Sequence, residues 1–251
     1  MIRLVLILLF WVAPLGAEEI VSGLSQSQVS INANFDGTAI LIYGAAMRDA
    51  PPPDWPLLQV IVTVEGPAFP VVVRHKERVA GIWINQGAVR VDSAPSFYAV
   101  ATTRPLRDIL SETDDLRYRI SLDNVVRAIG ISNEAPDAPS YVAALERIRT
   151  VENNYRLDQN SVLLLRQSLF RTDVALPANL IEGSYKVRIF LTRAGHVIDM
   201  QESQIDVQKA GLERFLFNLA QQQPLIYGLI SLLLAAVAGW GASEAFRRLR
   251  F

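Results

Sequence analysis

The chain has 251 residues, of which 51% are apolar and 20% are charged, so it contains enough apolar material for a sizeable core and is not of a disordered class. The formal net charge of −1 provides no global basic field, which argues against nucleic acid as a main partner. Cysteine is absent, and this excludes disulfides, thiolate metal sites and cysteine nucleophiles.

The N-terminus has the layout of a secretory signal peptide. Arg3 precedes an unbroken apolar run from Leu4 to Val12, and Ala17 is a plausible cleavage position before the first acidic residues. Residues 1–17 are therefore predicted to be a signal peptide. An uncleaved anchor is the alternative, because Leu15 is not an ideal residue at the third position before the cut.

Two regions of the body have the alternation of β-strands. In the first, about residues 29–103, the segment LQVIVTVE places Leu58, Val60, Val62 and Val64 on one face. In the second, about residues 161–208, SYKVRIFLT alternates in the same way and the RAGH turn leads into a returning strand. This pattern predicts a mainly β domain over residues 18–208, by fold-level analogy an immunoglobulin-like β-sandwich.

The stretch between the β regions has helical spacing and predicts an α insertion at about residues 106–156. Its first half is an imperfect repeat with a break expected near Ser121, and its second half carries one apolar stripe from Tyr141 to Tyr155. After the second β region, residues 209–223 are predicted to form a juxtamembrane amphipathic helix.

Residues 224–243 carry no charge and cover about 30 Å as a helix, the thickness of a bilayer core. Apolar side chains surround this segment, whereas a helix of a soluble core would keep one polar face. Tyr227 and Trp240 lie near opposite ends, where aromatic rings anchor at the membrane interface. The sequence predicts a single transmembrane helix here.

The tail, residues 244–251, contains Arg247, Arg248 and Arg250, and basic flanks are retained in the cytoplasm. Together with the signal peptide, this predicts a single-pass inner-membrane protein with a periplasmic body and a cytoplasmic C-terminus. Ala235 and Gly239 are four residues apart and are candidates for packing against another membrane helix. The alternative is that small residues are simply common in membrane spans.

No catalytic motif is present, and neither His75 nor His196 has a second histidine nearby. We therefore expect no enzymatic activity, no metal and no cofactor. The acidic run SETDD (residues 111–115) is flanked by arginines and is predicted to be a solvated helix face. Trp83, Phe97 and Tyr98 are expected in the core, with a partner surface as the alternative.

Several stretches of the sequence are similar to a known family. They are GLSQSQV, APSFYAVATTRPL, ILSETDDLRYRI, ALPANLIEGSYKVRIFLTRAG, QPLIYGL and GWGAS. Together they resemble a family of alphaproteobacterial transmembrane proteins of unknown function, from about Gly23 to the C-terminus. The resemblance implies a membrane span and a gene neighbourhood that often contains a sulfite-exporter-like permease. It implies no catalytic residues.

The sequence and this resemblance lead to one favoured hypothesis. We expect an accessory or partner-binding subunit of a membrane transporter, with membrane lipid and an integral membrane permease as partners. A periplasmic ligand-binding or sensing module is the alternative, and it requires a pocket lined by polar and aromatic groups between the sandwich and the helices. A hydrolase whose site is assembled from distant residues is less favoured.

Overall fold

The computed structural model describes residues 18–32, 35–49, 51, 55–126, 138–209 and 212–249. The predicted signal peptide lies outside the described residues, as does Arg250. The strands of the two larger sheets are β1 (Glu19–Leu24), β2 (Gln28–Ile31), β3 (Thr38–Met47), β4 (Gln59–Glu65), β7 (Tyr98–Thr102), β8 (Tyr155–Asp158), β9 (Leu163–Leu165), β10 (Leu169–Leu176), β11 (Gly183–Arg193) and β12 (His196–Lys209). Strands β5 (Ala68–Val79) and β6 (Ile82–Pro95) pair only with each other. The helices are α1 (Leu106–Ile109), α2 (Glu112–Tyr118), α3 (Leu122–Val125), α4 (Ala138–Val151), α5 (Leu212–Gln222) and α6 (Pro224–Leu249).

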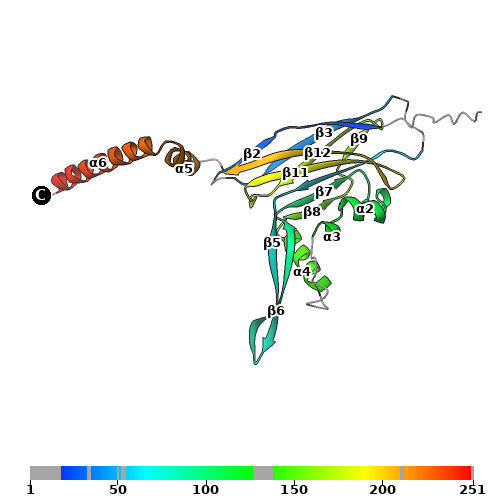
Figure 1. The fold of residues 1–251 in the computed structure, drawn as a ribbon, viewed down its shortest axis with the longest axis horizontal. Coiled ribbons are helices and arrows are strands. Elements are labelled where there is room, and N and C mark those ends of the chain that lie inside the picture. Colours follow the sequence, from blue (N-terminus) through cyan, green and yellow to red (C-terminus); the bar gives the residue numbers. More distant parts are fainter. Residues whose placement is uncertain are drawn as a thin grey trace, which may run out of the picture.

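The described strands form a four-stranded sheet in the order β1-β3-β10-β9, a six-stranded sheet in the order β2-β12-β11-β4-β7-β8, and the β5–β6 ribbon. Pairing is antiparallel except between β12 and β2 and between β7 and β8 (Figure 1). The prediction of a mainly β chain with one apolar C-terminal helix is confirmed.

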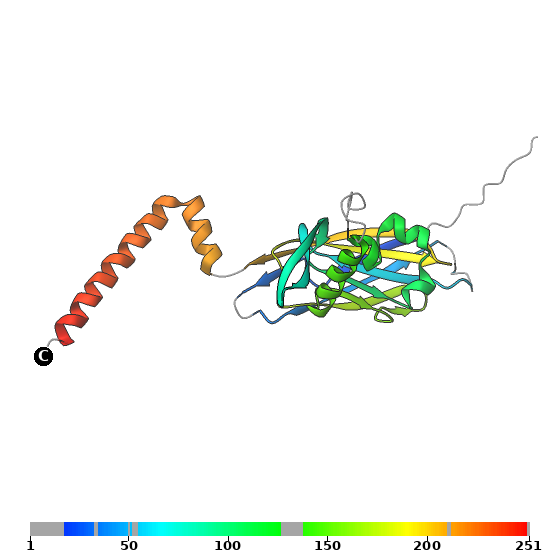
Figure 2. The same ribbon diagram turned by 90° about the horizontal axis from the view of Figure 1, so that it is seen from below.

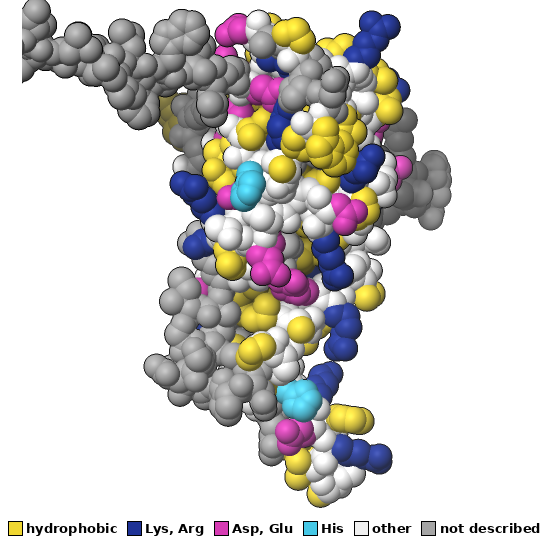
Figure 3. Space-filling view, turned by 90° about the vertical axis from the view of Figure 1, so that its right-hand side faces the viewer, with side chains coloured by type: hydrophobic (Ala, Val, Ile, Leu, Met, Phe, Trp, Pro, Cys, Tyr) yellow, Lys and Arg dark blue, Asp and Glu magenta, His cyan; other side chains and the backbone are white. Residues whose placement is uncertain are grey.

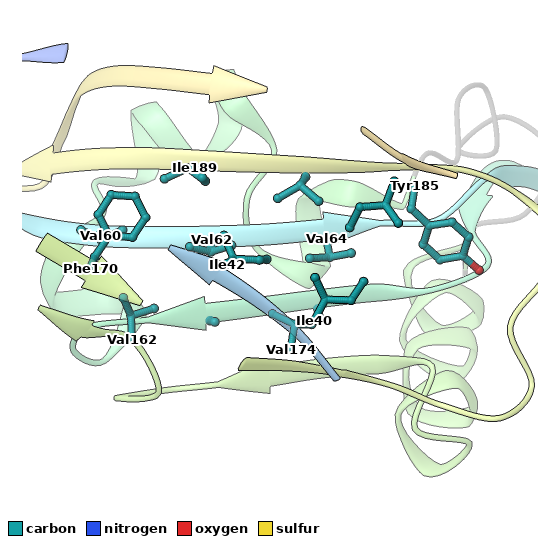
Figure 4. Packing of buried hydrophobic residues seen from close by; sticks show 14 of the residues in the cluster. Ile40, Ile42, Val60, Val62, Val64, Val162, Phe170, Val174, Tyr185 and Ile189 are labelled. Carbon is teal, nitrogen blue, oxygen red and sulfur yellow. The ribbon is translucent and has the colours of Figure 1, made fainter. Parts of the chain in front are cut away.

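The inner faces of the two larger sheets share one apolar core (Figure 4). Ile40 and Ile42 of β3 pack from the four-stranded sheet, while Val62 of β4 and Ile189 of β11 pack from the six-stranded sheet. The alternation read in SYKVRIFLT is the reason: every second residue of β11 from Tyr185 to Leu191 points inward and is buried.

The helices that follow β7 cover part of the outer face of the six-stranded sheet. Phe190 and Tyr98, which point away from the first core, are fully buried against Ile120 and Leu145 of the helical segment. The apolar stripe predicted for the second helix was partly wrong. Tyr155 lies in β8 and not in α4, although it is buried in the same cluster.

The β5–β6 ribbon projects from the body (Figure 1). Its half nearest the body is built into the second core through Val73 and Val91, and α4 packs against both of its strands. The other half extends past α4. The expectation that Trp83 is a core residue was wrong, because this side chain is 67% exposed near the end of the ribbon. Phe97 and Tyr98 are buried, as expected.

Helices α5 and α6 lead away from the β domain and meet at an angle at Gln223 (Figure 2). Pro224 starts α6, where a missing backbone N–H costs least. The side chains described in α6 are exposed along most of its length, so this helix buries no apolar face against the domain.

Candidate functional site

The outer face of the four-stranded sheet is apolar and exposed. Cross-strand pairing places Val21, Ala45, Leu169 and Leu165 in one row across β1, β3, β10 and β9. Leu169, in the middle of this row, is 57% exposed. Alternation along each strand accounts for the arrangement, since the intervening residues fill the core and these residues must point outward.

A second row on the same face contains Gly23, Tyr43, Arg171 and Leu163. The Tyr43 ring covers Gly23, where a Cβ would lie 2.9 Å from the ring. The two rows border a shallow groove of about 550 Å³, which we call the apolar groove. Its lining is mostly apolar and contains one cationic side chain, Arg171. Exposed apolar surfaces of this kind are typical of protein interfaces.

Sequence reasoning did not identify this groove. The signal was present in NSVLLLRQSLF, where apolar residues occupy both faces of β9 and of the start of β10. A strand with water on one side normally alternates apolar with polar residues. Leu163 and Leu165 break that rule, because neither side of β9 is polar.

A second hollow, which we call the basic hollow, lies between α2 and the outer faces of β11 and β12, with a volume of about 460 Å³. Its charged lining residues are Arg117, Arg119, Lys186, Arg188, Glu65 and Glu202. Four cations against two anions leave a net positive lining.

The guanidinium of Arg188 is fixed at the base of this hollow. Its Nη1 donates to the Tyr118 carbonyl at 2.6 Å and its Nη2 to the Arg119 carbonyl at 3.1 Å. The Glu65 carboxylate lies 3.9 Å away, a weak ion pair. The Tyr98 hydroxyl lies next to the Arg188 guanidinium. Burial raises the pKa of Tyr98 well above its usual value, so this hydroxyl stays protonated and donates to the Ile120 carbonyl at 2.8 Å.

The acidic run SETDD is only partly the solvated face that we expected. Asp114 is buried and accepts a hydrogen bond from the Val197 N–H at 3.0 Å. Asp115 accepts from the N–H groups of Ile120 and Ser121 at 3.1 and 2.8 Å. These two carboxylates therefore hold α2 onto β12 and onto the start of α3, which is a structural role.

Asp115 also lines a pocket of about 780 Å³ between α1–α3 and β8. The charged residues that line this pocket are Arg107, Glu112, Asp115 and Asp123, so its acidic groups outnumber its basic ones. The ligand-binding alternative required polar and aromatic groups between the strands and the helices. This pocket provides polar groups but no aromatic side chain.

The two histidines do not form a metal site. His196 Nδ1 lies 3.2 Å from Asp114 Oδ2, and His75 Nδ1 lies 3.6 Å from Glu77 Oε1. Within the described residues there is no group of three or more histidines and carboxylates that could hold a metal ion. The Asp114–His196 pair supplies two parts of a hydrolytic site, a base and the carboxylate that orients it, and a nucleophile would be the third.

With this geometry established, the chain can be compared with known proteins. Residues 19–248 match the model of the family described as "Putative transmembrane protein (Alph_Pro_TM)". The chain belongs to this family. The resemblance found in the sequence is thereby confirmed, and Alph_Pro_TM membership covers the β domain, both terminal helices and the helical insertion.

Beyond Alph_Pro_TM, similarity is slight. No curated protein matches the sequence. Among solved structures, Spo0M, the sporulation control protein from Bacillus subtilis, matches at 8% identity with a TM-score of 0.28. The match covers 82% of this chain and 56% of that chain, so this chain spans little more than half the length of Spo0M.

The feature that gives the Alph_Pro_TM family its description is found in α6. Residues Pro224–Ser243 form a helix long and apolar enough to cross a membrane. Tyr227 and Trp240 lie toward its two ends and are exposed, and Ala235 and Gly239 are exposed between them. Arg247 lies beyond the apolar segment. Arg248 is within α6, but its side chain is outside the described set.

Proposed function

We propose that the protein is a single-pass accessory subunit of a membrane transporter, and that its β domain binds an extracytoplasmic segment of its partner. The apolar groove carries the proposal. A contiguous apolar surface exposed to water is costly unless another molecule covers it, and such surfaces typically mark protein interfaces. The groove is also free of catalytic groups, which favours binding over chemistry.

The proposed topology combines the two termini. A cleaved signal peptide, residues 1–17, exports an immunoglobulin-like sandwich, residues 18–208, with its helical insertion at about 106–156. Residues 209–223 form a juxtamembrane amphipathic helix and residues 224–243 span the inner membrane. Residues 244–251 stay in the cytoplasm. The ion pair between Glu18 and Arg193, at 2.7 Å, supports a domain that begins at the predicted cleavage site.

Helix α6 is proposed to associate with a helix of the permease. Ala235 and Gly239 are one helical turn apart, and small residues at this spacing allow two helices to approach closely in lipid. Tyr227 and Trp240 set the depth of the helix, and Arg247, Arg248 and Arg250 fix its orientation. The permease is the partner that the family's gene neighbourhood suggests.

Site-specific photo-crosslinking in native membranes tests the groove. A benzophenone amino acid at Leu165 should give a discrete crosslinked band, and mass spectrometry should identify a membrane protein in it. The matched control carries the same group at Gln204, an exposed position on the outer face of the six-stranded sheet. A discrete band at Gln204 alone, or at neither position, would contradict the proposal.

A second candidate function, ligand binding, is favoured by the basic hollow. Its net positive lining and the fixed guanidinium of Arg188 suit a small anion, such as the sulfur oxyanions that a sulfite-exporter-like permease would carry. Sulfite, sulfate and an alkyl sulfonate should each be tested by thermal shift. A rise in Tm that disappears in Arg117→Gln supports this function, and unchanged Tm values with all three anions reject it.

A further inference from the structure

The outer half of the β5–β6 ribbon, residues 75–86, stands free of the body, and we call it the ribbon tip. A bulge marks where it begins: the pairing shifts between Arg74 and His75, and Gly87 adopts a φ of 72°. The Tyr141 ring of α4 packs edge-on against the His75 ring, with centroids 6.5 Å apart. Beyond this brace the strands continue alone to a two-residue turn at Ala80 and Gly81, whose φ values of 50° and 88° are typical of a tight hairpin.

The ribbon tip exposes large apolar side chains on both of its faces. Val79 pairs with Ile82, which is 65% exposed, and these two side chains lie on one face. Trp83 pairs with Arg78 on the opposite face. A protein partner that docks against a ribbon covers one face and leaves the other in water. Apolar groups on both faces instead suit surroundings that enclose the whole end of the hairpin.

Basic residues accompany the apolar tip. Arg74, Lys76 and Arg78 alternate along β5 on the face that carries Trp83, and Glu77 lies on the other face (Figure 3). Three cations against one anion give residues 74–86 a formal charge of +2, with histidine neutral. Tryptophan and aliphatic side chains flanked by Lys and Arg are characteristic of segments that enter the headgroup region of an anionic bilayer.

The ribbon begins at the end of the β domain from which the membrane helix leaves. Glu65, the last residue of β4, pairs with Lys186, and Gly183 at the start of β11 pairs with Val207. Two residues after β12 ends at Lys209, the chain enters α5. The base of the ribbon and the path to α6 are therefore neighbours at one end of the domain.

The lengths of the two connections also agree. The five cross-strand pairs from His75–Gln86 to Val79–Ile82 span about 17 Å as extended strands. The 11 residues of α5 span about 16 Å as a helix. In the structure the ribbon projects across the long axis of the β domain, whereas α5 and α6 lead away from its end (Figure 1). With α5 turned parallel to the ribbon, the ribbon tip reaches the level at which α6 begins.

From these observations we infer that the ribbon tip is a second membrane contact, which inserts Val79, Ile82 and Trp83 among the headgroups of an anionic bilayer. Arg74, Lys76 and Arg78 bind the lipid phosphates. Because the ribbon points across the long axis of the β domain, this contact lays that axis along the membrane (Figure 1). The domain is then held at two points rather than hanging from α6 alone.

The absence of cysteine allows a direct test on the full chain. Ile82→Cys is labelled with an environment-sensitive fluorophore, and the protein is reconstituted into phosphatidylcholine vesicles with or without phosphatidylglycerol. We expect a blue-shifted emission that lipid-attached nitroxides quench, and a stronger effect with phosphatidylglycerol. The matched control is Asp173→Cys, on the exposed outer face of β10, whose label should stay in water.

Removing the positive charges of the ribbon tip and its base sharpens the test. Replacing Arg74, Lys76 and Arg78 by Gln should move the tip from bound to free on anionic vesicles, by on the order of a hundredfold in the equilibrium. On neutral vesicles the same change should have little effect. Because these side chains are exposed, an unchanged unfolding transition verifies that the variant is folded.

Two results would overturn the inference. The label at position 82 could remain in water in every vesicle, or it could be shielded only in native membranes, where a crosslink to a protein would identify a protein partner instead. Neither result affects the proposed function, which is tested at Leu165. Conversely, a lipid-embedded tip with no crosslink at Leu165 would leave the membrane contact intact and reject the groove.

Discussion

The two larger sheets share one core, but their outer faces differ. The six-stranded sheet turns Phe190 and Tyr98 outward and buries both beneath the segment that contains α1–α4. The four-stranded sheet turns Tyr43, Leu165 and Leu169 outward and, among the described residues, no helix covers them. Both outer faces thus carry large apolar side chains, and the chain itself covers only those of the six-stranded sheet.

This difference separates folding from binding. On the covered face, apolar residues contribute to stability because the inserted helices remove them from water. On the uncovered face, similar residues contribute little to the stability of the isolated domain. Their apolar character instead favours a partner outside the chain. The same kind of substitution should therefore lower stability on the covered face and weaken partner binding on the uncovered face.

The largest expected effect is on the covered face. Phe190→Ala removes a fully buried ring whose centroid lies 5.7 Å from the centroid of the Tyr118 ring. This substitution should lower the free energy of unfolding by about 3–5 kcal/mol. Chemical denaturation followed by far-UV circular dichroism measures this. A loss of less than about 1 kcal/mol would mean that the helices do not cover the sheet as the structure shows.

A smaller effect on stability is expected at the contact between α3 and α4, two of the helices that cover the six-stranded sheet. Burial, together with the negative charge of Asp123, raises the pKa of Glu146 to about 7, so α4 meets α3 through two carboxyl groups. In the unfolded chain Glu146 titrates near 4.5, so the folded state binds the extra proton between these values. This contribution to stability is fully present below the unfolded pKa and is lost as the pH rises through about 7.

The denaturant concentration at the unfolding midpoint should therefore decrease as the pH is raised from about 5 to about 8. Glu146→Gln should make this part of the pH profile flatter. Asp123→Asn should flatten it in part, because it removes the neighbouring charge and leaves the burial. If Glu146→Gln kept the slope of the unmodified protein, the carboxyl pair would not be its origin. An intact slope in both variants would also show that the α3–α4 contact does not depend on pH.

The two faces were not equally predictable from the sequence. The alternation around Val62 and Val187 predicted correctly which residues of β4 and β11 share the face that lines the core between the two sheets. The free ribbon was missed, because PVVVRH and GIWIN have the composition of ordinary core strands. The packing of α4 determines how much of the ribbon is buried, and Trp83 lies beyond the part that α4 contacts. Long-range packing of this kind leaves no local pattern in a sequence.

The apolar groove was missed for a related reason. Local periodicity predicts that a residue faces outward, but whether a helix of the same chain lies over it depends on tertiary structure. Asp114 shows the converse. It was expected to be solvated with its acidic neighbours, and it is buried because β12 places the Val197 N–H beside it. In both cases the partner is distant in sequence.

The smallest effect on stability, and the sharpest contrast, is expected at Leu169. Leu169→Ser changes an exposed residue in the middle of the uncovered face and should alter the free energy of unfolding by no more than about 0.5 kcal/mol. The same variant should lose the membrane partner in a mild-detergent co-purification, since a polar group in the centre of an apolar interface is left without a hydrogen bond. Gln204→Ser, on the other sheet, should change neither measurement. A large loss of stability for Leu169→Ser would indicate that some part of this chain covers the groove, and the partner would then be unnecessary.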